Sequence, residues 1–87
     1  MGAPVNVPGT DYIAHEIGAR DYIEIMSKVD DPLQRMIHFA YFCTFNGGAQ
    51  LWASADECGS SPWPLVKKCA EAALVANELL EADHAGN

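Results

Sequence analysis

Basic residues are scarce in this chain of 87 residues. Five lysines and arginines stand against twelve acidic residues, and the formal net charge is −7. Surfaces that bind nucleic acid or anionic lipid gather Lys and Arg into a patch, whereas only Lys67 and Lys68 are adjacent here. We therefore expect no direct nucleic-acid binding and no membrane binding. Because the acids are spread along the chain, we expect an acidic surface suited to a protein partner with a basic or mixed surface.

Long apolar runs and paired cysteines are also missing. Spanning a bilayer takes about 20 consecutive apolar residues, and the longest apolar stretch, residues 36–45, is interrupted by His38 and Thr44. No basic and apolar leader precedes Ala3, so we expect no signal peptide. The three cysteines are an odd and sparse set for a disulfide-stapled secreted domain. These features favour a cytoplasmic protein.

The chain lacks the spacings that metal and catalytic sites require. Structural zinc ligands come in close pairs, but ten residues separate Cys58 from Cys69. Cys58 follows two acids in a turn-like segment, so we expect an exposed thiol whose neighbours disfavour the thiolate that a nucleophile needs. No phosphate-binding loop or serine-nucleophile motif is present. The sequence therefore predicts no metal, no cofactor and no enzymatic activity.

The first half of the sequence contains apolar residues at helical spacing. Residues 10–11 offer a suitable N-cap, and the apolar residues that follow predict a first helix. Gly18 weakens this helix, so we expect it to bend there or to restart at Asp21. Asp31 and Pro32 predict the start of the next helix, because Asp caps free N–H groups and Pro fits the first helical position.

The second half predicts a buried central helix and a long last helix. Residues 32–45 are apolar nearly all round, which is typical of a helix in a core. Residues 46–48, Asn-Gly-Gly, should end that helix, because both residue types accept the left-handed conformation of a C-cap. A short helix is expected over residues 49–55. After a turn-rich segment, a last helix should start between residues 61 and 64 and end near residue 82.

No segment alternates apolar and polar residues over strand length, so the sequence predicts an all-α fold. We expect one helical domain over residues 1–87, a small helical bundle of three main helices plus one short helix. Residues 1–10 should form an arm with little regular structure, and residues 83–87 a frayed end. Because the helix over residues 32–45 carries more apolar surface than so short a chain easily covers, we expect a homodimer that completes the bundle.

Two tryptophans and three acids are candidates for a protein interface. Trp52 and Trp63 are chosen because tryptophan is enriched among the residues that dominate binding energy. Glu78, Glu81 and Asp83 lie near the expected end of the last helix, where the helix dipole favours cations. A basic partner would explain these three acids.

The leading hypothesis is a non-enzymatic protein–protein interaction module, an inhibitor or accessory subunit that acts by binding a larger protein. One alternative is a bundle that holds a small apolar molecule in an aromatic-lined pocket formed by Met26, Met36, Phe39 and Phe42. Another is an acidic decoy that occupies the nucleic-acid site of a second protein.

Overall fold

The computed structural model describes residues 3–79, and in this part of the chain it contains helices and a sheet. The helices are α1 (Ala19–Lys28), α2 (Pro32–Cys43), α3 (Ala55–Gly59) and α4 (Trp63–Ala76). The strands are β1 (Val5–Asn6), β2 (Ile13–Ala14), β3 (Thr44–Asn46) and β4 (Ala49–Gln50). Each strand pairs antiparallel with the next, in the order β1-β2-β3-β4. The fold is therefore mixed α/β, and the prediction of an all-α helical bundle is wrong.

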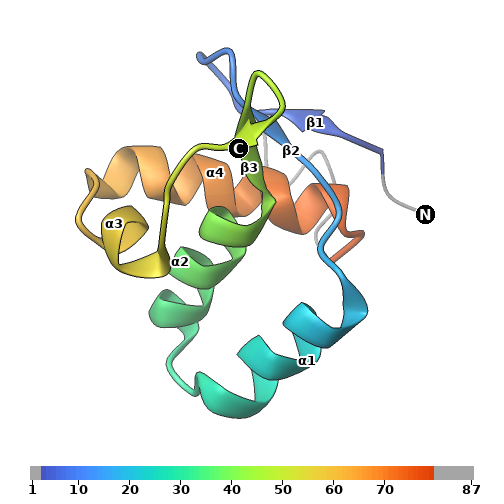
Figure 1. Cartoon of the computed structure of the whole chain (residues 1–87), viewed down its shortest axis with the longest axis vertical. Coiled ribbons are helices and arrows are strands. Elements are labelled where there is room, and N and C mark those ends of the chain that lie inside the picture. Colours follow the sequence, from blue (N-terminus) through green and yellow to red (C-terminus); the bar gives the residue numbers. More distant parts are fainter. Residues whose placement is uncertain (1–2, 80–87) are drawn as a thin grey trace.

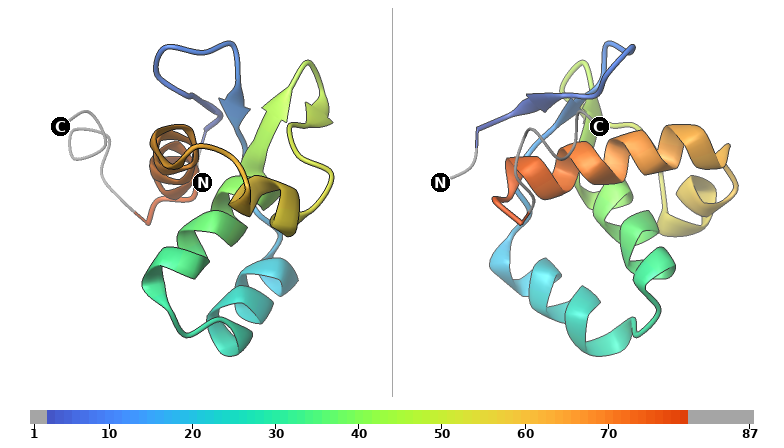
Figure 2. Two further views of the ribbon diagram at one scale, coloured as in Figure 1. Left: turned by 90° about the vertical axis from the view of Figure 1, so that its left-hand side faces the viewer. Right: turned by 180° about the vertical axis from the view of Figure 1, so that it is seen from behind.

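The sheet sits at one end of the molecule, and α1 and α2 extend away from it (Figure 1). Both helices lie in the sequence between the central strands, β2 and β3. α4 crosses α2 and contacts β1 and β2, so it lies against the sheet, as the view from behind shows (Figure 2). α3 packs against α2. None of the helices formed by residues 3–79 is long and apolar enough to cross a membrane.

The core lies where α2, α4 and the sheet meet. α4 contributes mainly small buried side chains, and these let it approach α2 and the strands closely. α2 contributes Phe39, Ala40 and Cys43, all buried. Tyr41 and Phe42 are partly buried against the same core. Most of the apolar surface of α2 is thus covered by its own chain, which removes the main reason for expecting a second copy.

A hairpin replaces the predicted arm and the part of the first helix predicted before Gly18, whereas α1 begins close to the restart expected at Asp21. β1 lies within residues 1–10, and the backbone N–H of Val7 donates to Tyr12 O (3.0 Å) across the connection to β2. The Thr10 hydroxyl donates to Val7 O (2.9 Å) and accepts from Tyr12 N (3.0 Å), so Thr10 organises a turn and caps no helix. β2 also pairs with β3. These pairings to distant backbone outweigh the local helical spacing, and α1 begins only at Ala19.

Gly47 and Gly48 form the turn of a second hairpin, where a helix C-cap was predicted. Phe45 pairs with Gln50 across them, and their φ angles are 64° and 91°. Two consecutive positive φ values are what a type I′ hairpin turn requires, and glycine supplies them without steric cost. The helix predicted over residues 49–55 is therefore replaced by β4, with α3 following at Ala55.

The ends of α2 and α4 test two further predictions. Asp31 caps α2 as predicted, since its side chain accepts a hydrogen bond from Gln34 N (2.9 Å) and Pro32 takes the first helical position. α4 starts at Trp63, within the predicted interval, but ends at Ala76, six residues before the predicted residue 82. The frayed end predicted for residues 83–87 lies outside the described residues.

Candidate functional site

The structure does not bring the predicted interface residues together. Trp52 is only 5% exposed, and its indole N–H donates to Ser61 Oγ (2.8 Å), so it belongs to the core and cannot meet a partner. Trp63 is 45% exposed at the start of α4. Glu78 is exposed just beyond the other end, about 20 Å along the helix axis. Glu81 and Asp83 lie outside the described residues.

The cysteine thiols are buried rather than exposed. Cys58 was predicted to be the most accessible thiol, but it is fully buried in α3, where Sγ lies 3.6 Å from Ile37 O. Burial, together with the neighbouring Cys69, raises the pKa of Cys58 to about 12. Burial also raises the pKa of Cys43 to about 11, against a smaller lowering by a hydrogen bond from Asn77. Neither thiol has the lowered pKa of a nucleophile.

Three of the four predicted pocket residues do line one depression. Met26, Met36 and Phe39 border a hollow of about 260 Å³ between α1, α2 and the chain after α4. We call this hollow the apolar groove; its full lining is Tyr22, Met26, Pro32, Arg35, Met36, Phe39, Leu74 and Leu79. Phe42, the fourth predicted residue, lines a separate hollow with Glu24 and Lys28.

The α1 wall of the apolar groove follows from helical spacing. Tyr22 and Met26 are four residues apart, so they share one face of the helix. Ile25 is buried and fixes α1 to the core, and the Tyr22 and Phe39 rings pack with their centroids 6.0 Å apart. Lys28, two residues after Met26, lies about 200° further round the helix and faces the other hollow.

Arg35 is the one charged residue among the groove's lining side chains, and it makes two hydrogen bonds within the fold. Its Nε donates to Val29 O and its guanidinium to Met26 O (3.2 Å). These bonds satisfy backbone carbonyls at the end of α1, where a cation is also favoured by the helix dipole. Arg35 therefore holds the α1–α2 turn in place and forms a wall of the groove.

The opposite wall is built by the way α4 ends. Asn77 is the C-cap, and Glu78 follows in the left-handed conformation (φ 59°). The N–H of Leu79 then donates to Leu74 O (2.8 Å), and that of Glu78 to Val75 O (3.0 Å). This is the hydrogen-bond pattern of a Schellman motif, which commonly brings the two apolar residues at its ends into contact. Leu74 and Leu79 are those residues here, and both line the apolar groove.

Exposed apolar side chains gather at this groove. Within the described residues the large exposed apolar side chains are Ile23 (62%), Met26 (36%), Leu33 (58%), Trp63 (45%) and Leu79 (47%). Met26 and Leu79 line the groove. Ile23 precedes Met26 on α1, and Leu33 precedes Met36 on α2, each by about one turn, so each lies next to a lining residue on its helix surface. All but Trp63 therefore lie in the groove or beside it.

Two other hollows formed by residues 3–79 offer less to an apolar ligand. The hollow that contains Phe42, of about 230 Å³, is bordered by an ion pair between Lys28 Nζ and Glu24 Oε1 (3.2 Å). A third, of about 400 Å³ between α2 and α3, is lined mainly by polar or small residues such as Gln34, Asp56 and Ser60. Among residues 3–79, no three His, Cys, Asp or Glu side chains are grouped as potential metal ligands.

Comparison with known proteins found no matching family model, no matching curated protein and no matching solved structure.

Proposed function

We propose that the protein is a non-enzymatic interaction module whose apolar groove receives an apolar segment of a larger protein. The observation that supports this is the gathering of exposed apolar side chains at one place, with Ile23, Met26, Leu33 and Leu79 in or beside the groove. Exposed apolar side chains that stand singly need no explanation, whereas a contiguous group marks a binding surface. Such a module acts as an inhibitor or accessory subunit, because it changes its partner by occupying a surface.

A small apolar molecule is the second candidate ligand for the same groove. It is favoured by the meeting of Met26, Met36 and Phe39, which the sequence predicted as pocket residues. Drug-sized ligands usually occupy about 300–1,000 Å³ and are buried on most sides. The groove, at about 260 Å³, is smaller, and Met26 and Leu79 remain well exposed. An open, shallow groove suits apolar side chains presented by another protein better than an enclosed molecule.

A cytoplasmic location is part of the proposal. All three cysteines are free and buried in the described fold, as suits a protein that acts where thiols stay reduced.

Site-specific photo-crosslinking in the cells that make the protein tests this function. A photoreactive residue is placed at Met26 in the groove, at Trp63, or at the exposed Ala49 on β4. We expect a discrete protein adduct from position 26 and none from position 49. Adducts from position 63 alone, or equal adducts from all three positions, would contradict the proposal. Capture of a small molecule at position 26 would favour the second candidate instead.

A further inference from the structure

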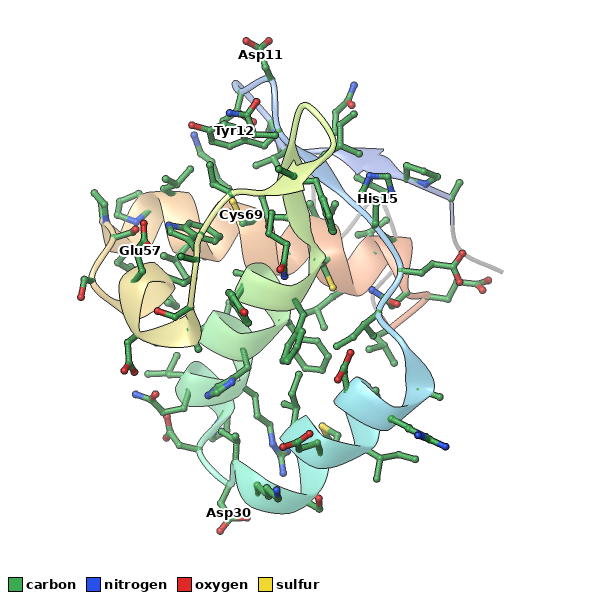
Figure 3. All side chains as sticks on the ribbon, in the orientation of Figure 1. Asp11, Tyr12, His15, Asp30, Glu57 and Cys69 are labelled. Carbon is green, nitrogen blue, oxygen red and sulfur yellow. The ribbon has the colours of Figure 1, made fainter. Side chains whose placement is uncertain are left out.

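Negative charge lies at both ends of the apolar groove. At the α1–α2 turn, the exposed Asp30 and Asp31 directly precede Pro32, which lines the groove. Figure 3 shows Asp30 at this turn, at the opposite end of the molecule from Asp11. Asp31 also caps α2, where its carboxylate accepts a hydrogen bond from Gln34 N (2.9 Å). A ligand lying in the groove would have one of its ends next to these two carboxylates.

The α4 end of the groove is negative for two reasons. Glu78 is exposed and directly precedes Leu79, and Glu71 lies one turn before Leu74 on α4. The carbonyl end of α4 also points to this place, and a helix C-terminus carries about half a negative charge. The acidic side chains and the backbone carbonyls therefore both contribute negative charge at this end of the groove.

Apart from Arg35, no lysine or arginine lines the groove. Arg20, in the first turn of α1, is exposed and is not among the lining residues. Lys28 pairs with Glu24 beside the other hollow. Lys67 and Lys68 are at the start of α4, and Lys68 Nζ reaches the β1–β2 connection at Gly9. Arg35 lines the groove and bonds to carbonyls at the end of α1, where the helix end carries about half a negative charge, so its own positive charge is offset only in part. A ligand in the groove thus meets an apolar floor between two acidic ends.

We propose that the occupant of the apolar groove is a cationic amphipathic helix of another protein. Its apolar residues, at helical spacing, would contact Met26, Met36 and Leu79, and its Lys or Arg residues would meet Asp30, Asp31 and Glu71 at the two ends. An amphipathic helix laid in an apolar groove is a recurrent mode of peptide recognition. This inference rests on the proposed function and adds the chemistry of the partner.

Charge disfavours the two occupants that the chain itself could supply. A second copy would bring two acidic grooves together, on molecules of net charge −7 each. Residues 80–87, which follow Leu79, would add Glu81 and Asp83 to an already acidic end. Like charges at close range cost free energy in both cases, whereas a cationic helix gains from the same field.

NMR titration of the full chain, labelled with ¹⁵N, tests the proposal with defined peptides. The first probe is an amphipathic peptide of about 14 residues, or about four helical turns, with leucine on one face and lysine elsewhere. The second keeps the leucines and replaces every lysine with glutamate. The third keeps the lysines and replaces every leucine with serine. We expect only the first to bind well, shifting amide signals of α1, α2 and residues 74–79, with an affinity at least about tenfold above the others.

Two variants that each lose two carboxylates show whether the acidic residues at the groove attract the peptide. The test variant is Asp30→Asn with Glu71→Gln, and the control is Asp11→Asn with Asp56→Asn. Each removes two negative charges, but Asp11 is in the β1–β2 connection, and Asp56 is in α3, against the side of α2 turned away from the groove. The test variant should bind the lysine–leucine peptide about threefold more weakly than the control. Equal losses in both variants would mean general attraction to an acidic protein and would overturn the proposal.

The remaining outcomes separate the partner's chemistry from the proposed function. If the glutamate peptide binds the groove as well as the lysine peptide, the cationic partner is wrong and the protein-binding groove stands. If the peptides shift no groove residue, both fail. If light scattering shows a dimer with the groove at its interface, a second copy is the occupant. Contacts between residues 80–87 and the groove in the free protein would show that the chain's own end fills it. Either result would overturn the proposal.

Discussion

At the scale of single residues, the side chain of Asn77 joins the end of α4 to the segment between β2 and α1. Its side-chain carbonyl accepts from Ile17 N (2.8 Å), and its amide donates to Ala73 O (2.8 Å) and, more weakly, to His15 O (3.4 Å). One side chain thus fixes the segment between β2 and α1 to the C-cap of α4. Because this segment leads directly into α1, Asn77 also helps to hold the start of α1 near the end of α4.

Replacing Asn77 should therefore destabilise the fold more than its partial exposure suggests. Asn77→Ala leaves the Ile17 N–H without its acceptor and should lower the free energy of unfolding by about 2 kcal/mol. Urea denaturation followed by circular dichroism measures the change. Asn6→Ala, at an exposed strand position, is the control and should change it by less than about 0.5 kcal/mol. Equal effects of the two substitutions would show that Asn77 has no special role.

The buried thiols make stability depend on alkaline pH. The pKa of Cys58 rises from 9.0 in the unfolded chain to about 12 in the fold, so the neutral thiol is favoured by folding. This contribution is complete below pH 9 and is lost as the pH rises from 9 towards 12. We expect the free energy of unfolding to fall between pH 7 and about pH 10.

Comparison with Cys58→Ala identifies the thiol's share of that decline. The variant should show a shallower fall in stability above pH 9 than the natural chain, whatever its stability at pH 7. Urea denaturation at several pH values gives both slopes. Identical slopes would mean that Cys58 ionises as freely in the fold as in the unfolded chain.

At the scale of elements, the sequence predicted helices better than strands. The start of α2 was predictable because Asp31 and Pro32 act through local chemistry, which the structure confirms. The strands have two or three residues each, too few to show an alternating pattern. Their stability comes from pairing with distant backbone, which no local spacing records. The two glycines of the second hairpin were predicted to end a helix, because a helix C-cap and a hairpin turn both need a positive φ.

Alanine substitution should have opposite effects on stability at Gly48, in the hairpin turn, and at Gly59, in α3. An added Cβ at Gly48 meets no atom within 4 Å, so Gly48→Ala tests only the backbone strain at φ 91°. It should lower the free energy of unfolding by about 1 kcal/mol. Gly59→Ala in α3 has no positive φ and meets Ile37 at an ordinary 3.8 Å, and it should raise stability by about 0.5 kcal/mol. Thermal unfolding distinguishes the two, and a stabilising Gly48→Ala would contradict the turn assignment.

At the scale of the whole molecule, the apolar groove is assembled from three distant parts of the chain. The sequence identified Met26, Met36 and Phe39 as potential pocket residues because they are apolar and flexible or aromatic at helical positions. It did not identify Leu74 or Leu79, because their meeting depends on where α4 ends and on the turn at Glu78. The five-residue spacing of these leucines, typical of a Schellman motif, is the signal that could have found them. Trp52 was predicted as an interface residue from its residue type alone, and the structure places it in the core.

The central claim is that the apolar groove, and no other exposed apolar site, binds a partner segment. Calorimetric titration of the lysine–leucine peptide into two variants tests it most directly. The groove variant is Met26→Gln with Leu79→Gln, and the control is Trp63→Gln, all at side chains between 36% and 47% exposed. Thermal unfolding checks that both variants keep the fold. We predict about a tenfold loss of affinity, or about 1.4 kcal/mol, for the groove variant and no significant loss for the control. Unchanged affinity in the groove variant, or an equal loss in the control, would contradict the account.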